Sequence, residues 1–288
     1  MKRVTVLGVT GMLGSMVYAY LRRNASLEVV GTDRSTFDAQ KFLASDLQKT
    51  VLRCDTIINC IGVIKPFCKD TDPVGVMNAV EVNALFPHRL AAHAKNQGTQ
   101  IIQIATDCVY SGAKGNYIES DPHDPLDVYG KSKSLGEVFD RSILNIRCSI
   151  VGPELKNKLS LLEWCLNNQD GAVLKGFAHH RRNGVTTLQF AKLCERIILN
   201  ENLYEDLLAV SPLHHFVPNS AVDKFELLNL IAEAYGRRFQ VVRVDNIGPP
   251  VNRTLATQFG VLARTYPSQS MKDALIELSK YSDWPDRK

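Results

Sequence analysis

The stretch Ile101–Glu137, IIQIATDCVYSGAKGNYIESDPHDPLDVYGKSKSLGE, carries the pattern that decides the fold. Its apolar start, Ile101–Ala105, predicts a buried strand, and a polar loop then leads into a helix bearing Tyr129 and Lys133. Residues four apart share one helix face, so the Lys133 ammonium can lie beside the Tyr129 phenol and favour the phenolate. Thr106, at the strand end, could hold a carbonyl oxygen there. The stretch predicts proton transfer to a carbonyl, although a surface tyrosine and a solvated lysine would give the same spacing.

A second pattern lies at the amino terminus, where the β-branched run Arg3–Leu7 precedes GVTGMLG at 8–14. Helical periodicity follows, so we expect a strand, a tight turn and a helix. Glycine permits the turn and the close approach of a dinucleotide, whose pyrophosphate would face the helix amino terminus. The predicted dinucleotide contacts here are Gly8, Gly11, Met12, Leu13 and Gly14.

The next predicted strand, Leu27–Val30, ends shortly before Asp33 and Arg34. A carboxylate at this place can accept hydrogen bonds from the adenosine ribose and favours NAD, whereas Arg34 and Ser35 could bind the 2′-phosphate of NADP. The two signals conflict. We expect NADP, because biosynthetic reductions usually draw on it, with NAD as the alternative; a solvated turn would also explain these residues.

The chain continues as an alternation of predicted strands and helices. This alternation predicts an α/β fold with a doubly wound parallel sheet of the Rossmann type, whose site lies outside the carboxyl ends of the strands. The further predicted strands are Thr56–Cys60, Ile143–Cys148, Leu207–Val210 and Phe239–Val244, and the predicted helices are Val74–Lys95, Leu161–Leu166, Leu188–Asn200, Asp223–Tyr235 and Ser270–Tyr281.

We expect a dinucleotide-binding domain over residues 1–150, rejoined by about 186–212, and a smaller C-terminal α/β substrate lobe over 151–288. Residues at the ends of predicted elements add cofactor contacts; these are Asp46, Leu47, Cys60, Ile61, Gly62, Asn83 and Ala105. Asn83 has this role only if its amide faces the core, because an exposed amide would hold nothing.

Composition narrows the class of protein. The 288 residues are 45% hydrophobic with a net charge of +4 and no long basic run, so we expect no nucleic-acid partner. Seven irregularly spaced cysteines without a C-x-x-C pair predict reduced thiols in the cytoplasm and no metal site. No apolar run of about 20 residues predicts a membrane span. The glycine spacing argues against reading the start as a signal peptide.

Taken together, these motifs resemble the extended short-chain dehydrogenase/reductases. The loop and helix at 106–137 are most similar to the dTDP-4-dehydrorhamnose reductase branch, and the resemblance covers residues 1–150 better than the remainder. It implies that Thr106, Tyr129 and Lys133 are catalytic and that Tyr129 and Lys133 also contact the cofactor. Tyr129 would protonate the C4 oxygen of a nucleotide-activated 4-keto-6-deoxy sugar as reduced nicotinamide delivers hydride, and Lys133 would bind the nicotinamide ribose.

One departure from that branch concerns Cys108, which stands where the reductases usually carry tyrosine. It resembles bifunctional epimerase/reductases, in which a cysteine works with a basic residue of the second lobe as an acid/base pair; a small buried thiol is the alternative. Candidates for that basic residue are Lys175, His179 and His180. The resemblance implies substrate contacts from Asp107, Cys108, Lys175, His179, His180, Arg181 and Arg253, the arginines as phosphate partners by charge alone.

Other functions remain open. A non-catalytic regulatory subunit could keep the same fold, but the intact Thr106, Tyr129 and Lys133 argue against it. Oxidation or epimerisation at C4 without net reduction is a further alternative. The sequence does not specify the sugar or the nucleotide, and it leaves assembly as a homodimer open.

Overall fold

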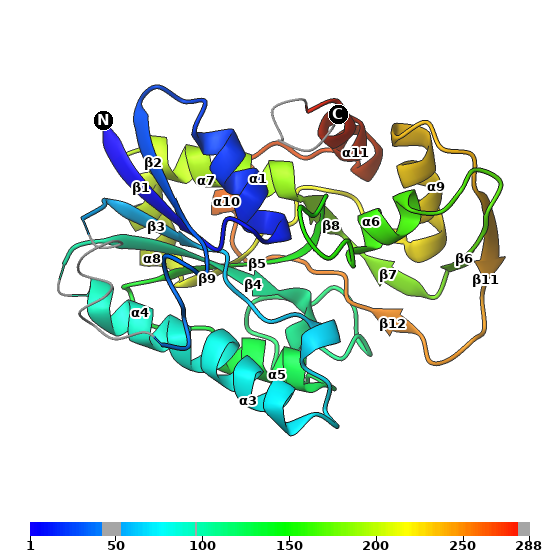
Figure 1. The fold of residues 1–288 in the computed structure, drawn as a ribbon, viewed down its shortest axis with the longest axis horizontal. Helices are drawn as coiled ribbons and strands as arrows, with labels where there is room; N and C mark the ends of the chain where they lie inside the picture. Colours follow the sequence, from blue (N-terminus) through cyan, green and yellow to red (C-terminus); the bar gives the residue numbers. More distant parts are fainter. Residues whose placement is uncertain (42–52, 96, 282–288) are drawn as a thin grey trace.

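The computed structural model describes residues 1–41, 53–95 and 97–281. At its centre lies a parallel sheet of order β2-β1-β3-β4-β5-β8, in which β9 also pairs with β5 (Figure 1). The strands are β1 (Lys2–Leu7), β2 (Leu27–Thr32), β3 (Thr56–Asn59), β4 (Gln100–Thr106), β5 (Leu144–Val151), β8 (Gly184–Thr186) and β9 (Leu213–His215). Because the order reverses around β1, the sheet is doubly wound, as the alternation predicts, and its ligand-binding edge lies at the carboxyl ends of the strands.

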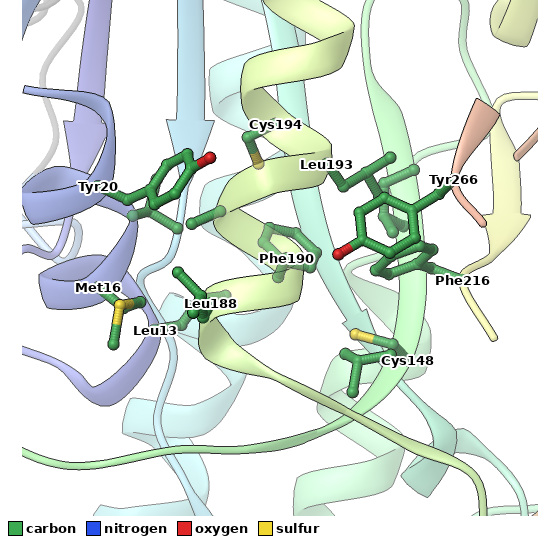
Figure 2. Close-up of a cluster of buried hydrophobic side chains, with 14 of the residues drawn as sticks. Leu13, Met16, Tyr20, Cys148, Leu188, Phe190, Leu193, Cys194, Phe216 and Tyr266 are labelled. Carbon is green, nitrogen blue, oxygen red and sulfur yellow. The ribbon is translucent and has the colours of Figure 1, made fainter. Parts of the chain in front are cut away.

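Helices cover both faces of this sheet (Figure 1). One face carries α1 (Met12–Leu21) and α7 (Thr187–Leu199), and the opposite face carries α3 (Pro73–Ala79), α4 (Phe86–Ala94) and α5 (Val128–Leu135). Figure 2 shows the core on the first face, where buried side chains of α1 and α7 meet above the sheet. Strands covered on both sides must be apolar on both sides, which explains the uninterrupted apolar runs in the sequence.

The long helix predicted over Val74–Lys95 is present but uneven. Between α3 and α4 its backbone widens into a π-helical stretch, Val80–Leu85, which includes Asn83. Pro87 has no N–H group and cannot donate to the carbonyl four residues earlier, that of Asn83. A widened turn accommodates this missing bond.

The strand predicted at 207–210 is wrong: this segment is the end of helix α8 (Leu203–Val210), and strand β9 follows it. The apolar residues recur at helical spacing rather than in alternation, and those buried are Leu203, Tyr204, Leu207 and Leu208. Strands β8 and β9 flank the segment 186–212 expected to rejoin the first domain, and we keep the division near residue 150 as a proposal.

Beyond residue 150, the described residues also form two small sheets. One pairs β6 (Val173–Phe177) with β11 (Gln240–Val244), and the other has the order β10-β7-β12. The strands of the latter are β7 (His180–Arg182), β10 (Val222–Asp223) and β12 (Val251–Asn252), and the helices are α6 (Leu161–Leu166), α9 (Lys224–Ala234), α10 (Val261–Thr265) and α11 (Met271–Lys280). Within the described ranges, none of the helices combines the length and apolarity needed to cross a bilayer.

Candidate active site

The glycine-rich turn between β1 and α1 forms one wall of the site. Gly8 has a φ of 84°, a conformation that favours glycine, and a Cβ on Gly14 would overlap the Gly8 carbonyl. Gly11 is the N-cap of α1 and contributes no side-chain cap, so the first amides of the helix are left for a ligand. The Met12 side chain is half-buried, and the Leu13 side chain packs into the hydrophobic core and supports the turn from that side.

A cavity of about 180 Å³ opens beside this turn. It is lined by Gly8, Thr10, Gly11, Asp33, Arg34, Phe37, Asp38, Ala39, Cys60, Ile61, Gly62 and Val82. Seven of these residues are cofactor contacts predicted from the sequence. The predicted contacts Asp46 and Leu47 lie outside the described residues.

Five lining residues were not predicted. Phe37, Asp38 and Ala39 return to the cavity after the turn at Asp33, and Val82 reaches it from the π-helical stretch; Thr10 is the remaining one. Only Thr10, between two predicted glycines, could have been inferred from its neighbours in the sequence.

Asp33 holds the turn that follows β2. Its Oδ1 accepts hydrogen bonds from the backbone N–H and the hydroxyl of Ser35, at 2.9 and 2.6 Å, and from the N–H of Thr36 at 3.2 Å. These bonds, that of the Ser35 hydroxyl foremost, lower the pKa of the Asp33 carboxyl. Arg34 is exposed and lines the same cavity as Asp33. The carboxylate that would favour NAD and the cation that would favour NADP therefore line one cavity.

The loop after β3 is fixed by two buried amides. Asn59 donates to Gln103 Oε1 at 2.7 Å and accepts from the Ile61 N–H at 3.1 Å. Asn83, 1% exposed, accepts from the Val63 N–H at 2.8 Å and donates to the Val63 carbonyl at 2.9 Å. The expectation that a core-facing Asn83 holds something in place therefore applies to this loop.

Thr106, Tyr129 and Lys133 come together where β4 ends beside α5. Thr106 is the last residue of β4, which also buries Ala105, and Asp127 caps α5 by accepting from the Gly130 N–H at 2.8 Å. The Lys133 Nζ donates to the carbonyl of Ile104 at 3.0 Å. This bond ties Lys133, and with it helix α5, to strand β4.

The direction of the Tyr129 pKa differs from the sequence-based expectation. Burial raises the pKa of the phenol, and Cys108 raises it further, while Thr106 lowers it by hydrogen bonding. Burial also lowers the pKa of Lys133 to about 8. Removal from water penalises charge on both groups, and it sets the direction of both pKa shifts. Tyr129 is consequently a protonated acid at neutral pH.

Cys108 lies in the loop after β4, two residues beyond Thr106. Its N–H donates to Thr106 Oγ1 at 3.2 Å, and Arg253 Nη1 lies 3.9 Å from its Sγ. Burial raises the pKa of the Cys108 thiol to about 11, against opposing effects of Lys65 and Arg253. The preceding Asp107 is buried and its Oδ1 accepts from the Thr106 hydroxyl at 3.2 Å.

Lys65 is a site residue that sequence reasoning missed. Its Nζ lies 2.6 Å from Asp127 Oδ2 and 5.8 Å from the centre of the Tyr129 ring. No motif surrounds it, and only the folded loop brings it to the helix amino terminus. It neutralises the capping carboxylate beside the phenol.

The predicted substrate residues beyond residue 150 lie on β6 (Lys175), in the turn before β7 (His179), on β7 (His180 and Arg181) and just after β12 (Arg253). His180 is half-buried on β7, and burial lowers its pKa, with smaller contributions from His179, Lys224 and Arg253. Both ring nitrogens of His179 lie against backbone carbonyls, those of Val244 at 3.3 Å and Ile247 at 3.0 Å. Lys175 on β6 and Arg181 on β7 are exposed. Of the predicted set, Arg253 is the one in contact with Cys108.

The RmlD substrate binding domain family matches residues 1–244. The dTDP-4-dehydrorhamnose reductase of Aggregatibacter actinomycetemcomitans is 25% identical over 285 residues, which cover 95% of this chain and 91% of that protein. Methionine adenosyltransferase 2 subunit beta of Danio rerio is 27% identical over 252 residues, covering 81% of this chain and 74% of that protein.

Solved structures share the fold. The dTDP-4-dehydrorhamnose reductase of Clostridium acetobutylicum has a TM-score of 0.76 at 21% identity and covers 96% of this chain and 98% of its own. That of Bacillus anthracis, in complex with NADP, has a TM-score of 0.77 at 17% identity with the same coverage. UDP-glucuronic acid 4-epimerase of Bacillus cereus, in complex with NAD, has a TM-score of 0.68 at 15% identity and covers 97% of this chain and 96% of its own.

Proposed function

The chain belongs to the RmlD substrate binding domain family, and from this premise we propose that it reduces the C4 keto group of a nucleotide-activated 4-keto-6-deoxy sugar with NADPH. Its class, an oxidoreductase of the extended short-chain dehydrogenase/reductase type, is the one expected from the sequence and is confirmed by family and fold. The observation that carries the proposal is the half-buried Tyr129 phenol hydrogen-bonded to Thr106 at the carboxyl end of β4.

The cofactor site suits a dinucleotide. The space between Gly8 and Gly14 would be filled by a Cβ, and the uncapped amino terminus of α1 offers amide donors to a pyrophosphate. When bound, the reduced dinucleotide supplies hydride. Arg34 would hold a 2′-phosphate and Asp33 a ribose hydroxyl, and we favour NADP, with NAD as the alternative.

Proton transfer falls to the residues of α5 and β4. Tyr129 carries the proton that the C4 oxygen takes up as negative charge develops on it, because the raised pKa of the phenol keeps it protonated in the resting site. The Thr106 hydroxyl orients the carbonyl. Lys133, held against β4, would contact the nicotinamide ribose and support the tyrosine when its proton leaves.

The proposed reduction is tested by following loss of reduced-nicotinamide absorbance with NADPH, and separately NADH, on addition of dTDP-, UDP- or GDP-4-keto-6-deoxyhexoses. We expect turnover with one of these sugars and a roughly 10²- to 10⁴-fold loss in Tyr129→Phe, the range for removal of a general acid. The control is that Tyr129→Phe keeps its thermal midpoint and still binds NADPH. Undiminished turnover in the variant would refute the proposal.

A second candidate adds epimerisation to reduction and uses Cys108. It is favoured by the Arg253 guanidinium beside the thiol, and the raised pKa of Cys108 makes the group an acid rather than a base. We expect Cys108→Ser to lose solvent-deuterium incorporation at the carbons flanking C4 while reduction persists. Unchanged incorporation in Cys108→Ser would leave simple reduction as the function.

A third candidate, a regulatory subunit, is favoured by the match to methionine adenosyltransferase 2 subunit beta. It predicts cofactor binding without turnover of any of the sugars, and the absorbance assay above distinguishes it.

A further inference from the structure

Arg253 occupies an unusual position for a residue expected to bind phosphate. Its half-buried side chain donates from Nε to the Tyr110 carbonyl at 2.8 Å, and its Nη1 lies 3.9 Å from Cys108 Sγ. Among the described residues, no carboxylate lies within ion-pair distance of this guanidinium. In the described part of the chain Nη2 makes no hydrogen bond and Nη1 makes only the long contact with the thiol, so both can donate to a bound ligand.

The backbone around Arg253 is firmly fixed. The Asn252 N–H donates to the Gly112 carbonyl at 2.7 Å, and the Arg253 N–H donates to the Arg181 carbonyl at 3.0 Å. Gly112 has a φ of 94°, and a Cβ there would lie 2.7 Å from Val251 Cγ1, so loop and segment pack in close contact. The guanidinium is thus held between the loop after β4 and strand β7 and does not extend freely into solvent.

This position lies at the reacting end of the site. The Cys108 N–H donates to Thr106 Oγ1 at 3.2 Å. The Cys108 thiol is the second-largest cause of the raised pKa of the Tyr129 phenol, the largest being burial. Arg253 therefore lies one side chain away from the groups proposed to hold and protonate the C4 oxygen. In a nucleotide sugar the diphosphate is attached to C1, which lies across the pyranose ring from C4.

Two cations lie near Cys108, and Arg253 is the one without a carboxylate partner among the described residues, so it can donate to a neutral or partly negative oxygen. Lys65, the other cation near the thiol, is paired with Asp127 at 2.6 Å. Of the two carbons next to C4 in a 6-deoxy sugar, C5 carries the methyl group and the ether oxygen of the ring, whereas C3 carries a hydroxyl, which is the stronger hydrogen-bond acceptor. A guanidinium donor at this place matches the oxygen at C3.

We infer that Arg253 is a specificity-determining residue that donates a hydrogen bond to the oxygen on C3 of the sugar, and that it does not bind the diphosphate. The inference rests on the proposed function for the identity of the sugar, and it replaces the phosphate role expected from charge alone.

The test measures equilibrium binding, by calorimetry, to the full chain saturated with NADP⁺, which cannot reduce the ligand. The probes are dTDP-4-keto-6-deoxyglucose, its 3-deoxy analogue and dTDP, with the corresponding UDP series as a second set. In the unmodified protein, removal of the 3-hydroxyl should weaken binding about tenfold or more. Arg253→Gln should weaken the parent sugar to the same extent, bind the 3-deoxy analogue as the unmodified protein does, and leave dTDP or UDP binding unchanged.

The matched control is Arg264→Gln, which removes an exposed arginine of α10 and should change none of these affinities. Equal NADP⁺ affinity and thermal midpoint in Arg253→Gln establish that the variant is folded. If Arg253→Gln weakens the free diphosphate as much as the sugar nucleotide, or if its effect and that of the missing hydroxyl add independently, the inference is wrong.

The proposed function fails separately. Intact binding with no turnover would refute the reduction but not the Arg253 contact, whereas failure of both nucleotide-sugar series to bind would overturn the two together.

Discussion

Burial changes the chemistry of Lys133 at the scale of a single residue. The pKa of this ammonium is lowered to about 8 in the folded chain, whereas an unfolded chain titrates its lysines near about 10.4. Between these values the unfolded state binds more protons, so the free energy of unfolding rises with pH over this window. Below it both states are protonated, and folding bears the full cost of burying the charge.

Lys133→Met removes this titration. In urea unfolding without cofactor, we expect the unmodified protein to gain up to roughly 3 kcal/mol relative to Lys133→Met between about pH 8 and pH 10. The difference between the two proteins is the measurement, because other groups titrate in both. Parallel stability curves for the two proteins would show that Lys133 keeps its ordinary pKa.

At the scale of the element, the turn between β1 and α1 separates two glycines that look equivalent in the sequence. A Cβ on Gly14 would collide with the Gly8 carbonyl, whereas a Cβ on Gly11 would lie 3.5 Å from that carbonyl, an ordinary contact. Gly14 therefore determines how closely α1 approaches the turn, and Gly11 meets the cavity instead.

We expect Gly14→Ala to lower the free energy of unfolding by about 1–3 kcal/mol through overpacking, while Gly11→Ala changes it little. Urea unfolding of both variants without cofactor measures the difference, and NADPH affinity reports separately on the cavity. Equal destabilisation by the two substitutions would contradict the packing argument.

At the scale of the whole molecule, a buried ion pair joins the segment just after α5 to the sheet and to the loop after β4. Arg147 of β5 is fully buried and bonds Glu137 through two nitrogens, at 2.9 and 2.5 Å. It also donates to the Tyr110 hydroxyl at 2.5 Å, and Tyr110 in turn accepts from Arg253 through its carbonyl. The imidazoles of His123 and His215 complete this network, each 2.7 Å from the guanidinium.

Arg147→Met leaves the Glu137 carboxylate buried without its cation. We expect a loss of about 3–5 kcal/mol in the free energy of unfolding, since breaking a buried pair costs more than replacing it. The double variant Arg147→Met with Glu137→Met should recover a large part of that loss, measured by the same urea unfolding. A double variant as unstable as Arg147→Met would show that the network, rather than the unpaired charge, supports the fold.

The sequence by itself determined the doubly wound sheet, the glycine turn and the order of Thr106, Tyr129 and Lys133. These features depend on local periodicity and on spacing within single elements, which neighbouring residues express directly. It did not reveal helix α8, because the apolar run that ends it is too short to separate a strand from a buried helical face.

Only the tertiary structure decided which charged residues reach the site and how they titrate. Lys65, Arg147 and Arg253 approach the catalytic loop from segments far apart in the chain, and no local pattern encodes that meeting. The pKa shifts of Tyr129 and Lys133 follow from burial, which depends on what packs around them. Spacing alone predicted a shared helix face, but solvent exclusion by the folded chain set the chemistry of the two groups.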